Sequence, residues 1–268
     1  MTLSLRLPCA RTLRVTATAV ASAVACATAA AALPQFTFNP AAGGISGAPA
    51  STITADNILI SDYSTVVIDA AGNFTDTGYL AVSSFQLGGT TFTPAGLNST
   101  YGMYFAFSAT GKQSVGNPAL VPTFGTFSSL SYTLYGYNGT GTFGFNGNTP
   151  TVTTTGAQTA LASGTLISGS VSTIPSGDGS TFTPSANARV NWTVLDQPFF
   201  VSPIPFYAMA ETAFTNTTGE VEPFANGFRI RQGGGSLNFV STVPEPGTFG
   251  LLLSGLAVVG FIARRRQT

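Results

Sequence analysis

The sequence predicts an all-β protein: a single antiparallel β-sandwich or jelly-roll-like domain, flanked by an N-terminal signal peptide and a C-terminal transmembrane helix. Apolar and polar residues alternate with a period of two in many short runs, which indicates strands with one buried face. Turn signals that contain glycine separate these runs. No long stretch between the two ends of the chain shows the 3.6-residue period of a helix.

Residues 1–32 have the layout of a secretory signal peptide. A basic segment precedes a short apolar run of Ala, Val and Thr, and Ala30 and Ala32 are the small residues that a signal peptidase accepts. The basic residues are Arg6, Arg11 and Arg14. We therefore expect the mature chain to begin at Leu33. A lipoprotein signal with Cys26 as the lipidated residue is the alternative.

Residues 33–243 form the body of the chain, which is long enough for one β domain of ordinary size. Residues 33–52 are rich in Gly, Ala and Pro, and we expect them to form a loose arm. The alternation that predicts strands is clearest further along. The segments that show it are 103–109, 130–137, 189–195 and 228–232, and a last strand is expected at 236–240.

Pairs of residues with glycine mark the expected turns, because glycine adopts positive φ at little cost. These signals lie at 88–89, 138–139, 146–147 and 176–179. Residues 137–140 lie between two aromatic runs and are expected to close a hairpin. Many short strands at this spacing favour a sandwich or a jelly roll.

Residues 244–268 read as an anchor. Pro244 and Pro246 fix φ and lack an N–H, so this stretch should stay extended and outside any sheet. Residues 248–263 carry no charge and are the predicted transmembrane helix. A helix of this length covers about 24 Å, which is short of the roughly 30 Å hydrocarbon core. Residues 264–266 are three arginines that would stop the helix on the cytoplasmic side.

This tail closely resembles the PEP-CTERM sorting signal of Gram-negative bacteria. The resemblance covers 243–266 and implies export, transient anchoring in the inner membrane, and processing near the motif by an exosortase, a membrane cysteine transpeptidase. The recognition residues would be Pro244, Glu245 and Pro246, followed by the basic residues Arg264, Arg265 and Arg266. It also implies a cell-surface or extracellular-matrix protein of a bacterium that makes exopolysaccharide.

Three segments of the body resemble the flocculation-associated subset of these proteins. They are LPQFTFNP at the mature start, AGLNSTYGMYFAFSATG, and ETAFTNTTGEVEPFANGFRIRQGGGSLNFV near the end. This resemblance implies a protein that helps retain exopolysaccharide and hold cells in flocs.

Composition excludes several kinds of chemistry. The chain has no histidine, and its two cysteines, Cys9 and Cys26, lie in the leader, so the mature chain can build neither a Ser-His-Asp triad nor a zinc site of Cys and His. Charged residues make up 7% of the chain, and the body holds nine acidic and four basic residues. Because phosphate recognition needs clustered Lys and Arg, the body is not expected to bind nucleic acid.

Carboxylates remain as candidate catalytic groups, since a pair of them can hydrolyse glycosides. The candidates are Asp62, Asp69, Asp76, Asp178, Asp196, Glu211, Glu220 and Glu222. The three aspartates spaced by seven, from Asp62 to Asp76, flank turn signals, and we expect turn and cap roles for them. No cofactor is expected, although a structural calcium ion held by carboxylates and backbone carbonyls stays open.

Sugar binding on a β surface is the specific activity that the residues favour. Tyr135 and Tyr137 share a face with Ser131 and Thr133, and Arg229 and Arg231 project together from another strand. Aromatic rings stack on sugars, and arginine donates hydrogen bonds to hydroxyl groups. These two tyrosines and two arginines are the predicted carbohydrate contacts. Trp192 is expected in the core.

The sequence thus predicts a non-enzymatic exported protein that retains exopolysaccharide and promotes flocculation and biofilm formation. Its expected partners are signal peptidase, exosortase, the inner membrane for a limited time, and the exopolysaccharide. Two alternatives remain. One is a glycoside hydrolase with paired Asp or Glu, and the other is a structural surface protein that self-associates through exposed edge strands.

Overall fold

The structure is a computed structural model that describes residues 32–241 and 255–256. Sixteen strands and one short 3-10 helix follow one another in the first of these ranges. The strands are β1 (Phe36–Phe38), β2 (Ile53–Ala55), β3 (Asn57–Ile68), β4 (Asn73–Leu87), β5 (Thr90–Phe92), β6 (Tyr101–Gln113), β7 (Thr123–Asn138), β8 (Gly141–Asn146), β9 (Thr149–Thr154), β10 (Gln158–Pro175), β11 (Phe182–Asn191), β12 (Thr193–Val194), β13 (Phe200–Ser202), β14 (Met209–Thr215), β15 (Val221–Phe224) and β16 (Gly227–Phe239), and the helix is η1 (Thr218–Glu220).

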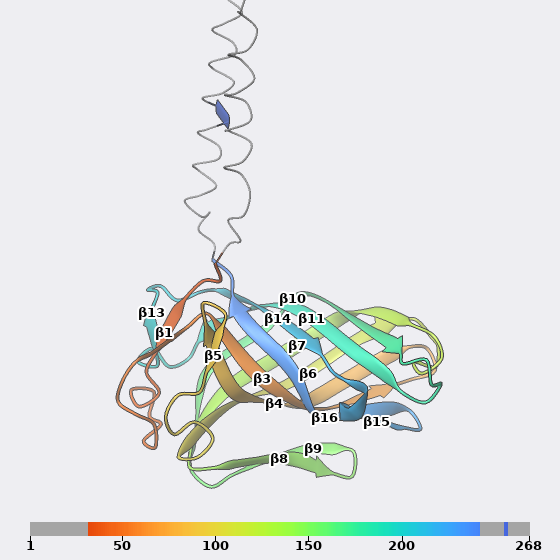
Figure 1. Ribbon diagram of the computed structural model, residues 1–268, viewed down its shortest axis with the longest axis horizontal. Helices are drawn as coiled ribbons and strands as arrows, with labels where there is room; N and C mark the ends of the chain where they lie inside the picture. Colours follow the sequence, from red (N-terminus) through yellow and green to blue (C-terminus); the bar gives the residue numbers. More distant parts are fainter. Residues whose placement is uncertain (1–31, 242–254, 257–268) are drawn as a thin grey trace, which may run out of the picture. The chain divides into compact units, whose positions relative to one another are not determined.

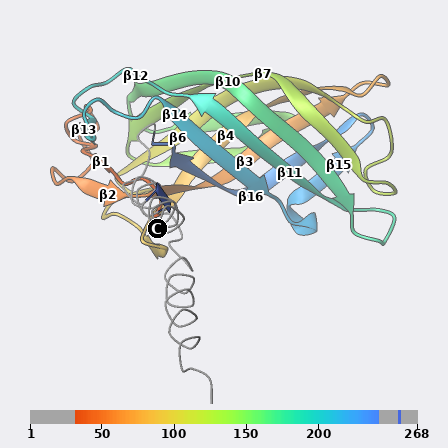
Figure 2. The ribbon, with the colours of Figure 1, turned by 90° about the horizontal axis from the view of Figure 1, so that it is seen from above.

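Eight long strands form one antiparallel sheet that closes on itself. Their order is β11-β14-β16-β3-β4-β6-β7-β10, and β10 pairs with β11 to complete the ring. The prediction of an all-β antiparallel domain is therefore confirmed, and the two layers expected of a sandwich are opposite walls of one continuous sheet. Figure 1 and Figure 2 show these strands running obliquely around the domain.

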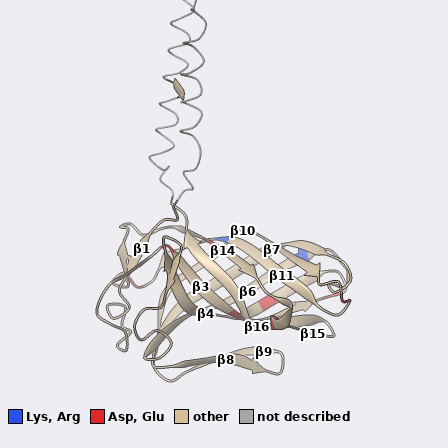
Figure 3. Cartoon of the chain, viewed as in Figure 1, with Lys and Arg blue, Asp and Glu red and all other residues tan. Residues whose placement is uncertain are grey.

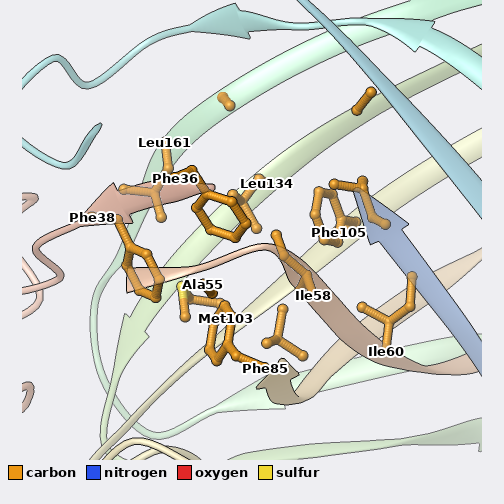
Figure 4. Packing of buried hydrophobic residues seen from close by; sticks show 14 of the residues in the cluster. Phe36, Phe38, Ala55, Ile58, Ile60, Phe85, Met103, Phe105, Leu134 and Leu161 are labelled. Carbon is orange, nitrogen blue, oxygen red and sulfur yellow. The ribbon is translucent and has the colours of Figure 1, made fainter. Parts of the chain in front are cut away.

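The strands form because their side chains alternate between the inside and the outside of the closed sheet. In β3 the even-numbered residues Ile58 and Ile60 are buried, and in β6 the odd-numbered Met103 and Phe105 are buried. The larger core cluster lies toward the end of the sheet that β1 and β2 cover, where Phe38, Ala55 and Phe85 pack together with Met103 (Figure 4).

Trp192 lies in this core, as expected, and is 5% exposed. Its ring packs edge-on against Phe239 at 4.8 Å between centroids, and against Phe200 and Phe105 at 5.9 and 6.2 Å. Such edge-to-face pairs add to the free energy gained by burying the rings themselves.

The expectation of a loose arm at 33–52 is wrong. β1 pairs with β2 and β13 in a small separate sheet, and Phe36, Phe38 and Ile45 are each no more than 2% exposed. The segment is ordered although it is rich in Gly and Pro. Burying each of its large rings contributes about 2–3 kcal/mol, which favours packing on the core.

Glycine takes positive φ at each expected turn, with Gly88 and Gly89 at 58° and 79° between β4 and β5. The predicted hairpin at 137–140 is not formed, although Gly139 turns the chain with φ 76°. β7 pairs with β6 and β10 instead, and β8 pairs with β9 across the Asn146-Gly147 turn. A local turn signal does not decide which strands pair.

The β8–β9 hairpin is a two-stranded sheet of its own beside the closed sheet (Figure 1). It rests on β3, because the Thr65 hydroxyl donates a hydrogen bond to the Asn148 carbonyl at 2.6 Å. The predicted membrane segment 248–263 lies outside the described residues apart from Gly255 and Leu256, which are helical. Within the described ranges no helix is long and apolar enough to span a membrane.

Candidate functional site

The residues predicted for sorting and cleavage fall at the two ends of the described chain. Ala32 is exposed and has no regular structure, and Ala30 lies outside the described residues. The motif Pro244, Glu245 and Pro246 and the arginines 264–266 also lie outside them. Their roles stay predictions as far as the structure is concerned.

The predicted sugar contacts Tyr135 and Tyr137 belong to an aromatic cluster on the outside of the closed sheet. Tyr104 is its centre, with Tyr135 stacked on it at 5.4 Å and Phe143 of the hairpin edge-on at 5.7 Å. Tyr137 is 1% exposed, because its ring fits against Gly102, where a Cβ atom would lie 2.2 Å from the tyrosine oxygen. Tyr137 therefore offers a ligand no surface, whereas Tyr135 is half-buried.

The predicted sugar contacts Arg229 and Arg231 lie together on β16, as the sequence indicates, but both have protein partners. Each forms an ion pair with Glu222 of β15, at 2.5 and 2.9 Å. Both guanidinium groups also lie over the ring of Phe145, at 5.5 and 5.7 Å. Arg229 donates a further hydrogen bond to the Gly147 carbonyl at 2.5 Å. The two arginines therefore hold the β8–β9 hairpin on the sheet.

Exposed hydroxyl side chains form rows on the outside of β4, β6, β7 and β10. One row crosses all four strands in register, because Thr77 pairs with Ser108, Ser108 with Ser131, and Ser131 with Thr165. The next row along the strands joins Thr75, Thr110 and Ser129. All seven residues are exposed, and we call them the hydroxyl face. Adjacent strands lie about 4.8 Å apart, so the hydroxyl groups repeat at about that spacing.

The strands of the domain carry few charged residues (Figure 3). Thr110 and Ser129 are hydrogen bonded to each other at 2.7 Å, and either oxygen can be the donor. A hydroxyl group can donate and accept at once, so even a paired hydroxyl keeps capacity for a ligand. The arrangement presents closely spaced donors and acceptors without requiring an ionic partner.

A cavity of about 80 Å³ lies inside the closed sheet, and every one of the eight strands contributes to its wall. Most of the wall is apolar, but Asp62 of β3, Asp76 of β4 and Asn216 after β14 also line it. Asp62 and Asn216 are 5% and 2% exposed. The Oδ1 atoms of all three are buried without a hydrogen-bond partner.

Burial changes the protonation of the two interior carboxyls. It raises the pKa of Asp62 from 3.8 to about 7, and the Ser64 hydroxyl and Glu220 act on it in opposite directions with smaller effect. Burial also raises the pKa of Asp76 well above its ordinary value, and the neighbouring Asp62 raises it further. The Ser64 hydroxyl lies close enough to lower both pKa values, but it is not in hydrogen-bonding geometry with either carboxyl.

The remaining carboxylates that were candidates for glycoside hydrolysis mostly have structural partners. Asp69 accepts hydrogen bonds from the Asn73 side chain and from the backbone of Asn73 and Ala71, as its predicted turn role requires, and these bonds lower its pKa. Asp178 accepts from the Ser180 and Thr181 amides in the same way. Others form ion pairs or caps. These are Glu211 with Arg189, Glu222 with Arg229 and Arg231, and Glu220 with the Thr217 amide.

The turn role expected for Asp62 and Asp76 is wrong, and the sequence carries a signal that places them. Asp62 continues the inward alternation of Ile58 and Ile60, and Asp76 lies two residues after the buried Phe74. Period-two alternation therefore puts both carboxyls on the inner face. Their seven-residue spacing, which suggested repeated turns, has no structural meaning.

Comparison with known proteins gives one match. No curated protein and no solved structure is significantly similar to the chain. Residues 242–267 match the family model of the PEP-CTERM protein-sorting motif, and this range includes the Pro-Glu-Pro triplet and the three arginines. The chain therefore carries a PEP-CTERM sorting motif at 242–267, and this motif supports export to the cell surface with processing by an exosortase.

Proposed function

We propose that this surface protein retains exopolysaccharide and thereby promotes flocculation and biofilm formation, and that it does so without catalysis. The observation that carries the proposal is the hydroxyl face, which gives an exported domain a surface suited to a neutral, hydroxyl-rich polymer. The flocculation-like segments of the sequence point to the same role.

The energetics favour a polymer over a small sugar. A single hydrogen bond exchanged with water contributes only about 0.5–1.5 kcal/mol, so one sugar unit on one or two hydroxyl groups would bind weakly. A chain that crosses several strands makes many such contacts at once, and each contact raises the effective concentration of the next. A regular row such as Thr77, Ser108, Ser131 and Thr165 provides this repetition.

The experiment is a sedimentation assay of the mature protein with exopolysaccharide extracted from the producing bacterium. A variant with Thr77→Val, Ser108→Ala, Ser131→Ala and Thr165→Val removes one hydroxyl row with little change in shape. The matched control is Thr142→Val with Thr153→Val, an exposed cross-strand pair on the β8–β9 hairpin. We expect the first variant to lose at least about tenfold in affinity, equivalent to about 1.4 kcal/mol, and the control to bind normally.

The dependence on salt separates this mechanism from ionic binding. Contacts between neutral hydroxyl groups are not screened, so raising NaCl from 0.05 to 0.5 M should leave the affinity almost unchanged. Equal binding by wild type and the hydroxyl-row variant would overturn the proposal. Hydrolysis of the polymer by the mature protein would replace it with the glycoside hydrolase alternative.

A further inference from the structure

Four oxygen atoms in or beside the interior cavity have no hydrogen-bond partner, and three of them belong to side chains that line it. They are Asp62 Oδ1, Ser64 Oγ, Asp76 Oδ1 and Asn216 Oδ1. Leaving a buried polar atom unpaired is unfavourable, so several such atoms on neighbouring strands call for a partner. Nothing in the proposed surface function uses these side chains.

The strand register places three of the four on the inner face of two adjacent strands. Ser64 pairs with Gly78, Asp62 lies two residues away on β3, and Asp76 lies two residues away on β4. Gly78 is required here, because a Cβ atom would lie 2.6 Å from the Ser64 Cβ. The two strands can therefore approach closely at Ser64, between the two carboxyls.

Asn216 follows β14, which is separated from β3 by β16. Its Oδ1 atom packs on Gly233 of β16, where a Cβ atom would lie 1.9 Å from it. Gly233 pairs with Asp62 across β16 and β3, next to a bulge in β16. Ser64 and Asn216 are 0% and 2% exposed, so neither is turned toward bulk solvent.

The size of the cavity and the two acidic groups in its wall select the ligand. A volume of about 80 Å³ is too small for the drug-sized molecules that fill pockets of about 300–1,000 Å³. It suits an ion with one or more waters. Among the described residues that line the cavity, Asp62 and Asp76 are the only ionisable ones, so no Lys or Arg neutralises them.

We infer that the interior of the closed sheet binds one hard divalent cation, such as Ca²⁺, through Asp62, Asp76, Ser64 and Asn216. Calcium takes six to eight oxygen ligands from carboxylates, neutral oxygens and water, and this set provides two carboxylates and two neutral oxygens. No group of three or more acidic, His or Cys side chains suited to a metal occurs among the described residues. Only two of the four proposed ligands are carboxylates, so we expect the affinity of a weak extracellular site, with Kd on the order of 10⁻⁴–10⁻³ M.

The cavity adjoins a surface groove at one end of the closed sheet. A groove of about 850 Å³ is lined there by the loops at 69–72, 114–119 and 223–227. It shares the wall residues Gln113 and Phe228 with the interior cavity. Phe228 packs edge-on against Phe182 at 5.0 Å, so the two rings separate groove from cavity.

The test is the thermal unfolding of the mature protein in 10 mM CaCl2 and in NaCl of equal ionic strength. We expect Ca²⁺ to raise the Tm by about 3–10 °C, as a ligand at 10 to 100 times its Kd does for a domain of this size. The double variant Asp62→Asn with Asp76→Asn should lose this shift. The control Asp69→Asn with Asp178→Asn removes two exposed turn carboxylates and should keep it.

Asparagine has nearly the shape of aspartate and carries no charge, so the double variant should fold at least as stably as wild type without Ca²⁺. Native mass spectrometry of the wild-type protein gives a second readout, for which we expect one Ca²⁺ per chain. The inference is overturned if Ca²⁺ does not shift the wild-type Tm, or if the double variant keeps the full shift.

Discussion

At the scale of single residues, the buried carboxyls of Asp62 and Asp76 are the feature with the clearest physical consequence. Burial in a mostly apolar wall raises the pKa of both carboxyls, Asp62 raises that of Asp76 further, and Glu220 raises that of Asp62. A carboxyl that is buried in this way holds its proton to higher pH than it does in the unfolded chain. The stability of the fold is therefore tied to pH near neutrality.

The sign of this dependence follows from the pKa of Asp62, which is 3.8 in the unfolded chain and about 7 in the folded one. Between 3.8 and about 7 the folded state binds more protons at Asp62 than the unfolded state, so the contribution of Asp62 to the free energy of unfolding falls as pH rises through that range and then levels off. The raised pKa of Asp76 acts in the same direction. The slope is on the order of 1 kcal/mol per pH unit. Urea unfolding in EDTA between pH 5 and pH 7.5 measures it. Asp62→Asn with Asp76→Asn should flatten the profile, whereas a wild-type stability that rises over this range contradicts the assignment.

The side chain of Trp192 supports a second prediction at this scale. Trp192→Ala removes a ring that packs against Phe105, Phe200 and Phe239 and should cost about 3–5 kcal/mol of unfolding free energy. Leu195→Ala is the control, because Leu195 is 51% exposed and its change should stay within about 0.5 kcal/mol. Urea unfolding followed by far-UV circular dichroism measures both. A loss below 1 kcal/mol for Trp192→Ala would show that the ring does not pack as described.

At the scale of elements, the sequence predicted strands and turns well and their pairing poorly. Alternation identified β6, β7, β11 and β16, and glycine at the expected turns takes positive φ. The β10–β11 pairing that closes the sheet joins neighbours in the chain, but β16–β3 joins strands about 170 residues apart, and no local pattern encodes it. A local turn signal likewise does not encode pairing, so the hairpin expected at Asn138-Gly139 is not formed and β7 pairs with β6 and β10.

The predicted sugar contacts show the same limit at the site. Alternation correctly put Tyr135 and Tyr137 on one face, and Arg229 and Arg231 on another. What it could not show is that the β8–β9 hairpin lies over these faces and uses Arg229, Arg231 and Tyr104 as its supports. The hydroxyl face was visible in part through Ser131, but its rows depend on the register of four strands.

The hairpin itself gives a prediction at this scale. Phe143→Ala removes one ring, which is stacked on Tyr63 at 5.5 Å and edge-on to Tyr104 at 5.7 Å. Hydrogen exchange should speed up in residues 141–154, while the closed sheet keeps its protection, because the hairpin pairs with no strand of that sheet. Thr142→Ala, at an exposed position, should change nothing. Faster exchange throughout the domain would show that the hairpin is part of the same cooperative unit.

At the scale of the whole molecule, the chain combines a sorting signal with a domain of low charge that is built around its own core. The sorting motif occupies 242–267, directly after the last strand at Phe239. The domain therefore has little spacer between its sheet and the processing site. The sorting motif at 242–267 directs the protein to its location, and the proposed contact with the polymer is made by the hydroxyl face on the outside of the closed sheet.

Processing can be tested separately from polymer retention. Replacing Pro244, Glu245 and Pro246 by alanine should abolish cleavage, because the motif read by the exosortase is lost. The intact mass of the protein should then include residues 244–268, and the protein should stay in the membrane fraction. Pro118→Ala in a loop of the domain is the control. Normal cleavage of the triple variant would contradict the role of the motif.

The most direct test of the account measures how exopolysaccharide divides between flocs and culture medium. We compare the wild-type bacterium, a strain without the protein, and a strain with the hydroxyl-row variant of Thr77, Ser108, Ser131 and Thr165. The account predicts that total polymer is the same in all three, and that both altered strains release more of it into the medium and settle more slowly. Unchanged retention and settling in the strain without the protein would contradict it.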